Sequence, residues 1–572
     1  MDYKNYPAMS QVARGMGKAD LVLKNGNVLN VFTEEFHEAD IAICGGTIVG
    51  VGSYSGNREI DMRGKYVVPG FVDSHLHLES TLVQPFELIN EALKYGTTTF
   101  VVDPHESANV AGLDGIDYIL DQTSDVAANV FVMVPSCVPA APFEDNGYIL
   151  NPGEMKKYLE NERILGLGEV MDCPAVITGD SVMMEKLDMF QPKILDGHAP
   201  FLNDGDLAAY ALAGIKTDHE CCDYEYAKKE IGNGIYVLIR EGSAAKNLEA
   251  IVKGIVSEHA STERYCFCTD DKHIEEIKKD GHISFNVKKA VSLGIPPQKA
   301  LKMASWQATV CYGMKNLGAI APGYQADVVV LDDLENIRVA DVFHKGMNIK
   351  EYSAKGRIPC PENIKHTVQV KDFNRKKLEI ETGEKEFPVI EIIPGQIVTK
   401  KVFEKLPAKD GIFISDNIYS KIAVVERHKG TGKVGVGVLK GFGIRNGAIA
   451  SSVSHDSHNI IVVGDNDDDM VAAVNELIEK QGGYTIISGG KSAGTLPLPV
   501  MGLMSDAGHE EVEEKLKTMI SKAWEMGVNP KIDTFINLSF MALPVIPEIR
   551  ITARGIYDVA ENVFYGKDGQ AK

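Results

Sequence analysis

The chain has 572 residues and carries 59 basic against 80 acidic side chains, a formal net charge of −21. Hydrophobic residues make up 44% and charged residues 24%, which is ordinary for a folded protein and excludes global disorder. The length predicts about three domains, or one large barrel with additions. Because the negative charge repels phosphate backbones and no basic patch offsets it, we expect no nucleic-acid partner.

The sequence predicts no secretory signal and no membrane helix. Residues 1–20 lack the apolar core and cleavage site of a secretory signal. The longest uncharged run, residues 126–143, contains three prolines, which is typical of a buried strand and its loop rather than of a membrane helix. Nine cysteines are too few for a disulfide scaffold of this size, so we interpret them as reduced thiols. We therefore expect a cytoplasmic protein with no membrane partner.

The first region, up to about residue 68, shows short alternating strands separated by glycine, at 21–31 and 41–52. A β-like pattern returns at 318–334 and continues through 339–349. Because one β segment precedes the central region and another follows it, we expect one small β-sandwich domain built from residues 1–68 and 317–370.

The central region, residues 69–316, alternates strand-like and helix-like segments, with helices expected at 85–96 and 244–258. The apolar strands are at 67–75, 97–103, 129–135, 164–170, 193–198, 214–219, 234–240 and 265–270. Eight parallel strands with crossover helices in about 250 residues predict an α/β fold with a TIM-type (β/α)8 barrel.

The remainder of the chain has a pattern of its own. Strands are expected at 411–415, 421–428, 459–465 and 483–490, and helices at 469–481 and 510–527. These elements predict an additional C-terminal α/β domain at residues 387–572, joined to the rest through the charged stretch 370–385.

Imidazoles and carboxylates end most of the expected barrel strands. His75 and His77 end the first strand and point to the same side, because residues i and i+2 of a strand share a face. The later strand ends carry Asp103, His105, Glu106, Glu169, His198, Asp218, His219, Glu220, Asp270 and Asp271. Since barrel active sites lie at the C-terminal strand ends, we expect these side chains to converge on one pocket that binds metal ions through mixed nitrogen and oxygen ligands.

The chain resembles the amidohydrolase superfamily of metal-dependent hydrolases and, within it, the adenine deaminases. The resemblance rests on these strand ends and on the strings VDPHE (102–106), GLGEVMD (166–172), DGHAP (196–200), DHE (218–220) and FCTDDKH (267–273). It extends through SHDSHN (454–459) and GGKSAGTLPLPVMGLMSD (489–506), so it covers nearly the whole chain.

The resemblance implies a binuclear metal centre of Mn²⁺ or Fe²⁺, with Zn²⁺ as a further possibility. One ion would be held by His75, His77 and Asp270 and the other by His198 and His219, with Glu169 between them. Many members of the superfamily use a carbamylated lysine where this chain has Glu169, which argues against the carbamate-dependent cyclic amidases.

The implied activity is purine salvage: adenine and water become hypoxanthine and ammonia through a hydroxide activated by the metal centre. Asp270 is the expected base that passes a proton to the leaving ammonia. Glu106, Glu220 and Asp271 are candidates for protonating the purine ring, or else carboxylates that orient the ligand histidines. We expect a purine base as the substrate and a homo-oligomer, with a dimer as its expected state.

Other functions stay open. One is an amidohydrolase of the same superfamily that cleaves a cyclic amide or an N-acyl amino acid, and another is a non-catalytic scaffold. The zinc signature of a different deaminase fold is excluded, because Pro359 and Cys360 are not followed by a second cysteine. His455, Asp456 and His458 form either a lid or accessory site over the barrel mouth or a polar turn.

Overall fold

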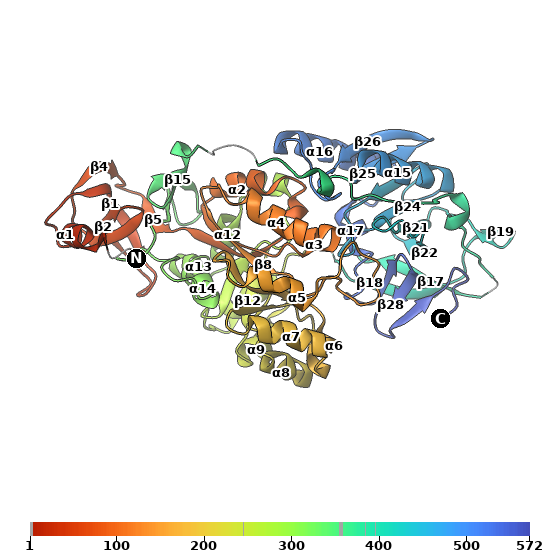
Figure 1. The fold of residues 1–572 in the computed structure, drawn as a ribbon, viewed down its shortest axis with the longest axis horizontal. Helices are drawn as coiled ribbons and strands as arrows, with labels where there is room; N and C mark the ends of the chain where they lie inside the picture. Colours follow the sequence, from red (N-terminus) through yellow and green to blue (C-terminus); the bar gives the residue numbers. More distant parts are fainter. Residues whose placement is uncertain (1–3, 244, 354–357, 384, 395) are drawn as a thin grey trace.

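A computed structural model gives the structure of residues 4–243, 245–353, 358–383, 385–394 and 396–572. The molecule is elongated, with an N-terminal β region at one end, a strand-and-helix region in the middle and a C-terminal region at the other end (Figure 1). Among the described residues, every helix is too short or too polar to span a bilayer.

The central region contains two parallel sheets whose strands coincide with the eight expected from the sequence. The first sheet comprises β6 (Phe71–Leu76), β7 (Thr97–Val102), β8 (Asn129–Val134), β9 (Ile164–Val170) and β10 (Ile194–Gly197) in sequential order. The second comprises β11 (Thr217–Asp218), β12 (Tyr236–Arg240) and β13 (Tyr265–Cys268).

The two sheets meet at both edges. At one edge the backbone N–H of Asp270 donates to the carbonyl of His75 (3.0 Å), and at the other Lys216 donates to Leu195 (3.0 Å). The resulting parallel sheet is curled, and the carboxyl ends of its strands face one side, where the candidate site lies.

Helices connect and cover these strands (Figure 1). They are α2 (Pro85–Leu93), α3 (His105–Ala111), α4 (Leu113–Gln122), α5 (Pro152–Met155), α6 (Cys173–Thr178), α7 (Ser181–Phe190), α8 (Asp204–Leu212), α9 (Tyr224–Gly232), α10 (Leu248–Ser257), α11 (Ile274–Asp280), α12 (Ile283–Ser292), α13 (Pro297–Met303) and α14 (Trp306–Cys311). In α10 the buried residues Leu248, Ile251 and Ile255 follow helical spacing, so burial of one apolar face holds the helix against the sheet.

Strands from both flanks of the central region lie in one mixed sheet. Its strands are β1 (Ala19–Asn30), β2 (Glu35–Cys44), β3 (Thr47–Gly52), β4 (Gly56–Asp61), β5 (Tyr66–Pro69), β14 (Val328–Leu331), β15 (Val339–His344) and β16 (Met347–Asn348). Gly26 lies within β1 and marks a shift in register with β2. A side chain there would lie 2.6 Å from Val67, which explains the glycine. Helix α1 (Tyr6–Ala13) precedes the strands and was not expected from the pattern.

The C-terminal region is built on a sheet with the order β18-β17-β22-β21-β24-β23-β25-β26. Its elements are β17 (Phe387–Ile392), β18 (Thr399–Glu404), β21 (Tyr419–Val425), β22 (Val434–Lys440), β23 (Ala448–Ser451), β24 (Ile460–Gly464), β25 (Gly483–Ser488), β26 (Lys491–Pro497), α15 (Asp467–Lys480), α16 (His509–Glu525) and α17 (Ile536–Phe540). Two small antiparallel sheets complete it: β19 (Ala408–Lys409) with β20 (Ile412–Phe413), and β27 (Ile549–Thr552) with β28 (Gly555–Asp558) and β29 (Val563–Tyr565).

The C-terminal region packs directly on the central one. Ser505 donates its backbone N–H to the carbonyl of Leu82 (2.8 Å), and one hydrophobic cluster includes Leu82 and Val83 together with Met501 and Leu503. This packing brings C-terminal loops to the carboxyl ends of the central strands.

Candidate metal centre

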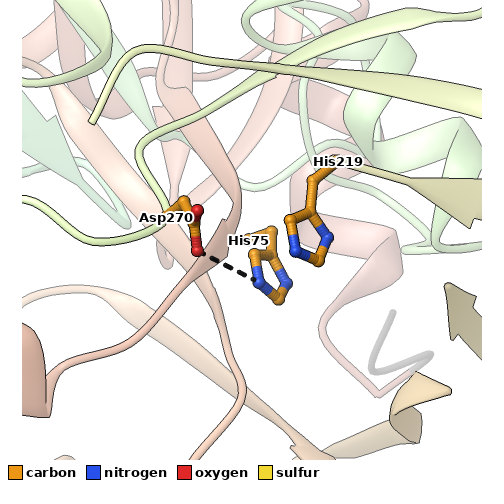
Figure 2. Close-up of side chains that lie close together, drawn as sticks. All are labelled: His75, His219 and Asp270. Atoms are coloured by element: carbon orange, nitrogen blue, oxygen red, sulfur yellow. Dashed lines mark ion pairs between the residues drawn. The ribbon is translucent and has the colours of Figure 1, made fainter. Parts of the chain in front are cut away.

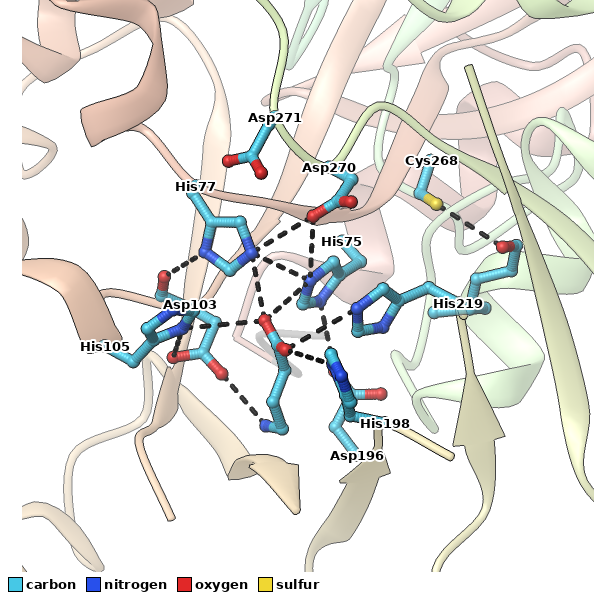
Figure 3. A network of polar contacts seen from close by, with 12 residues as sticks. His75, His77, Asp103, His105, Asp196, His198, His219, Cys268, Asp270 and Asp271 are labelled. Carbon is cyan, nitrogen blue, oxygen red and sulfur yellow. Dashed lines mark hydrogen bonds and ion pairs between the residues drawn. The ribbon is translucent and has the colours of Figure 1, made fainter. Parts of the chain in front are cut away.

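The structure brings the six expected metal ligands together at the carboxyl ends of the curled sheet. Figure 2 shows His75, His219 and Asp270, and Figure 3 shows these residues with His77 and His198. Their exposed fractions are 0% for His75, 3% for His77, 3% for Glu169, 6% for His198, 1% for His219 and 7% for Asp270. Each lies in or directly after a strand, so the fold fixes its position.

Glu169 lies among the four histidines and contacts each of them. One carboxylate oxygen, Oε1, is 3.0 Å from His75 Nε2 and 2.9 Å from His77 Nε2. The other, Oε2, is 3.0 Å from His198 Nδ1 and 3.5 Å from His219 Nε2. Two pairs of imidazoles therefore share one carboxylate, one pair on each oxygen.

The hydrogen bonds of His77 show that this pocket suits a cation. Its Nδ1 is 2.9 Å from the carbonyl oxygen of Asp103, an acceptor, so Nδ1 carries a proton and a neutral ring leaves Nε2 with a lone pair. That Nε2 faces Glu169 Oε1, Asp270 Oδ1 at 3.2 Å and His75 Nε2 at 3.2 Å. A lone pair surrounded by carboxylate oxygens is unfavourable unless positive charge lies among them.

Two ring nitrogens of the group lack hydrogen-bond partners. His198 Nε2 and His219 Nδ1 are buried without a hydrogen bond among the described residues. Two sets of ligand atoms that share Glu169 each lie within 4.8 Å of one another, one with His75 and His77 and the other with His198 and His219. Four imidazoles and two carboxylates form the mixed nitrogen and oxygen donor set that Mn²⁺, Fe²⁺ and Zn²⁺ accept. The donor set therefore fits a binuclear centre.

The electrostatics of the isolated side chains point the same way. Burial lowers the pKa of His75, but the charge of Glu169 and a contact with Asp196 raise it to about 10 overall. Burial likewise lowers the pKa of His77, yet Glu169 and Asp270 raise it well above its usual value. The carboxylates thus demand positive charge at this place, and divalent cations satisfy the same demand.

Four buried aspartates hold the ligand loops, and two of them, Asp73 and Asp196, were not expected at the site from the sequence. Asp103 accepts the backbone N–H of Glu169 (2.9 Å), and Asp196 Oδ2 lies 3.4 Å from His75 Nδ1. The other two are Asp73, which accepts the backbone N–H of Thr269 (3.1 Å), and Asp218, which accepts that of Ala199 (2.6 Å). The signal was present in the sequence, because an aspartate stands one or two residues before each strand-end histidine.

Arg240, at the end of β12, was not expected at the site from the sequence either. Its Nη1 and Nη2 both bond Glu220, and Nη1 also donates to Asp270 Oδ2 (2.9 Å). The arginine therefore ties two of the expected site carboxylates together. Burial lowers the pKa of Arg240, but Glu220 and Asp270 raise it well above its usual value, so it is a fixed cation.

The remaining expected carboxylates lie on the other side of the group. Ser80 Oγ donates to Glu106 Oε1 (3.3 Å) and also bonds Asp271. His105, expected at the end of the second strand, lies between the metal ligands and the C-terminal region: its Nδ1 is 3.5 Å from Glu169 Oε1 and its Nε2 is 3.7 Å from Asp456 Oδ1.

One pocket joins this group to the C-terminal region. The central region lines it with His77, Glu106, Glu169, His198, His219, Glu220, Arg240, Asp270 and Asp271, and the C-terminal region lines it with Ile397, His455, Asp456, Phe540, Leu543 and Ile546. His455 and Asp456 therefore face the site, whereas His458 is buried behind them. The segment is a turn before β24, but a buried one rather than a surface turn.

Residues 66–368 match the amidohydrolase family model, and residues 396–562 match the adenine deaminase C-terminal domain. An adenine deaminase of Desulfitobacterium hafniense is 54% identical over 99% of both chains. The chain belongs to the adenine deaminase family of the amidohydrolases.

Two further adenine deaminases support this placement. The protein from Clostridium acetobutylicum is 44% identical over 96% of this chain and 98% of its own, and that from Halalkalibacterium halodurans is 42% identical over 97% and 96%. A crystal structure of an adenine deaminase aligns with 58% of this chain and 99% of its own at 16% identity and a TM-score of 0.44. The family resemblance expected from the strand ends is confirmed.

Proposed function

We propose that this chain is an adenine aminohydrolase that converts adenine and water to hypoxanthine and ammonia, as part of purine salvage. The observation that carries the proposal is Glu169, whose two oxygens each face a pair of imidazoles in a buried pocket. The curated relatives that match this chain over nearly its full length bear the name adenine deaminase.

We assign the ligands as the resemblance implies. His75, His77 and Asp270 would hold one divalent ion, His198 and His219 the other, and Glu169 both; Mn²⁺ or Fe²⁺ are the proposed metals. When bound, the pair of ions lowers the pKa of a water molecule so that it can add to a carbon centre at neutral pH. The remaining tasks fall to the side chains of the chain itself.

Asp270 is the proposed base. Its Oδ1 faces the histidines, at 3.2 Å from His77 Nε2, while its Oδ2 is held by Arg240 (2.9 Å). The residue also has a left-handed backbone, with φ of 58°, which aspartate tolerates better than most residues. Arg240 thus fixes the direction in which Asp270 takes a proton from water and passes it to the amino group that leaves as ammonia.

The pocket suits a flat base. Ile397, Phe540, Leu543 and Ile546 form an apolar wall from the C-terminal region opposite the polar strand ends. A purine ring buries its faces against such a wall while its polar edge meets the carboxylates. Because the C-terminal region covers this space, we propose that free adenine is accepted and that adenosine, with a ribose on N9, is rejected.

We also propose the finer architecture that the sequence predicted. The curled sheet would be a closed (β/α)8 barrel at residues 69–316, and the flanking sheet a small β-sandwich at 1–68 and 317–370. Residues 387–572 would form a domain that completes the pocket. A homodimer is the proposed assembly.

The proposal is tested by ammonia release from adenine, adenosine, guanine, cytosine and hydantoin with Mn²⁺ added. We expect rapid release from adenine and at least a hundredfold lower kcat/KM for adenosine. Hydantoin opening without adenine turnover would favour the cyclic-amide alternative instead. Purified protein that releases no ammonia from adenine would contradict the proposal.

A further inference from the structure

His455 reaches the pocket from the C-terminal region, in the turn between β23 and β24. Its Nδ1 lies 3.0 Å from Glu106 Oε1, at the start of α3. Its ring stacks on Phe540, with centroids 4.6 Å apart and planes 23° apart. The imidazole is therefore fixed in both position and direction by two elements that are far apart in the sequence.

The second ring nitrogen of His455 is available. Nε2 makes no hydrogen bond within the part of the chain that the structure describes, and His455 lines the same pocket as the metal ligands. With Nδ1–H donated to Glu106, a protonated ring presents Nε2–H as a free donor. A free, oriented donor at the wall of a purine pocket is what protonation of a ring nitrogen requires.

Two of the carboxylates considered from the sequence suit this step less well. Glu220 accepts hydrogen bonds from Arg240 on both of its oxygens, so its carboxylate is already engaged by a buried guanidinium. Glu106 accepts from Ser80 and faces His455, which favours its ionised form. Asp271 contacts the same Ser80 hydroxyl, whose single proton can serve only one of the two carboxylates at a time. The acid that protonates the purine ring is therefore better sought in the C-terminal region than among these carboxylates.

The cluster of Glu106, His455 and His458 also has the composition of a metal site, with ligand atoms within 4.8 Å of one another. However, Ser454 donates its backbone N–H to His458 Nδ1 (3.2 Å). A neutral His458 must then carry its proton on Nε2, so neither nitrogen offers a free lone pair to a metal. The hydrogen bonds therefore favour a proton-donating pair over a third ion.

We propose that His455, oriented by Glu106, is the acid that protonates ring nitrogen N1 of adenine as water adds to C6. This inference rests on the proposed function. The C–O bond at C6 forms while the proton moves from Nε2 of His455 to N1, where it remains in hypoxanthine. The C6–N6 bond then breaks, and N6 leaves as ammonia with one proton of the water, carried by Asp270. The second proton of the water restores the imidazolium of His455.

The surroundings of His455 favour its charged form. Burial lowers its pKa, but the charge of Glu106, the contact with Asp456 and the charge of Asp271 raise it well above the usual value. Burial lowers the pKa of His458, in the same turn, to about 3, so this ring adds no positive charge beside His455. His455 is thus charged and His458 neutral at pH 7.

The test uses His455→Gln in the metal-loaded full chain, because glutamine can still donate to Glu106 but cannot deliver a proton. His366→Gln, an exposed histidine, is the matched control. We expect kcat for adenine to fall about a hundredfold or more with KM changed only a few-fold, while the metal content stays at about two ions per chain. Glu106→Gln is the second variant.

The pH profile separates a proton donor from a structural residue. Wild-type kcat should fall at alkaline pH as His455 loses its proton, and His455→Gln should lack this limb. In Glu106→Gln the limb should move to lower pH, because the charge that raises the pKa of His455 is gone. Imidazole added to His455→Ala should restore part of the rate.

Three results would overturn the inference: His455→Gln with wild-type kcat, an unchanged alkaline limb in that variant, or three ions per wild-type chain of which one is lost in His458→Gln. Failure of the proposed function is distinguishable, since the wild type would then release no ammonia from adenine.

Discussion

Arg240 holds Glu220 through both of its terminal nitrogens, with Nη2 at 3.1 Å from Oε2, on the wall of the candidate pocket. Both residues are buried, with exposed fractions of 2% and 6%. The same guanidinium reaches Asp270, so the proposed base and its neighbour share one cation. A buried pair of this kind orients the carboxylates as well as neutralising them.

We therefore expect the Arg240→Gln variant to be inactive but still folded at room temperature. Removing one partner leaves buried carboxylates without a counter-charge, which costs about 3–5 kcal/mol. We expect kcat to fall at least a hundredfold and Tm to drop by several degrees. Arg240→Lys should recover little activity, because lysine cannot form the two parallel bonds. Steady-state kinetics measures kcat and thermal denaturation measures Tm. A fully active Arg240→Lys variant would contradict the role assigned to the two hydrogen bonds from Arg240 to Glu220.

Glu169→Gln tests the shared carboxylate. Glutamine keeps the size but removes the negative charge that faces four imidazoles, so at least one ion should bind more weakly and turnover should fall strongly. Elemental analysis after gel filtration measures the ions. The exposed Glu162→Gln serves as the control. Full metal content together with wild-type kinetics in Glu169→Gln would show that another group lies between the ions.

Gly168→Ala tests how tightly the strand ends are packed. An added Cβ would lie 2.2 Å from Asp103 Oδ2, the atom that accepts the backbone N–H of Glu169. Displacing Asp103 leaves that N–H buried without a partner, which costs about 1–3 kcal/mol. We expect a lower Tm and weaker metal binding. Gly232→Ala, in an open position at the end of α9, should change neither, and equal Tm values for both variants would refute the packing argument.

The sequence predicted the parts of this site that follow from periodicity. Strand ends at His75, Glu169 and Asp270 were found because apolar runs mark parallel strands and polar residues stand where they stop. Arg240 was missed although its strand was expected, since one arginine at a strand end has no signal until its partners are known. The contact of His455 with Glu106 joins segments 349 residues apart, which no local pattern reveals.

Glu144 should make stability depend on pH. Burial and the charge of Asp456 raise the pKa of this carboxyl to about 8, against about 4.5 in the unfolded chain. The folded state therefore binds its proton more tightly, and this contribution, complete below pH 4.5, is lost as pH rises toward 8. Glu144→Gln mimics the protonated form, so its Tm should exceed that of the wild type increasingly between pH 5 and 8. Parallel Tm curves in a pH series would contradict this.

The most direct measurement of the central claim is a titration of the metal-stripped chain with Mn²⁺ while ammonia release from adenine is followed. The account predicts almost no activity without metal, a rise with each addition and a plateau at about two ions per chain. Full activity in the stripped protein, or no ammonia from adenine at any metal content, would contradict it.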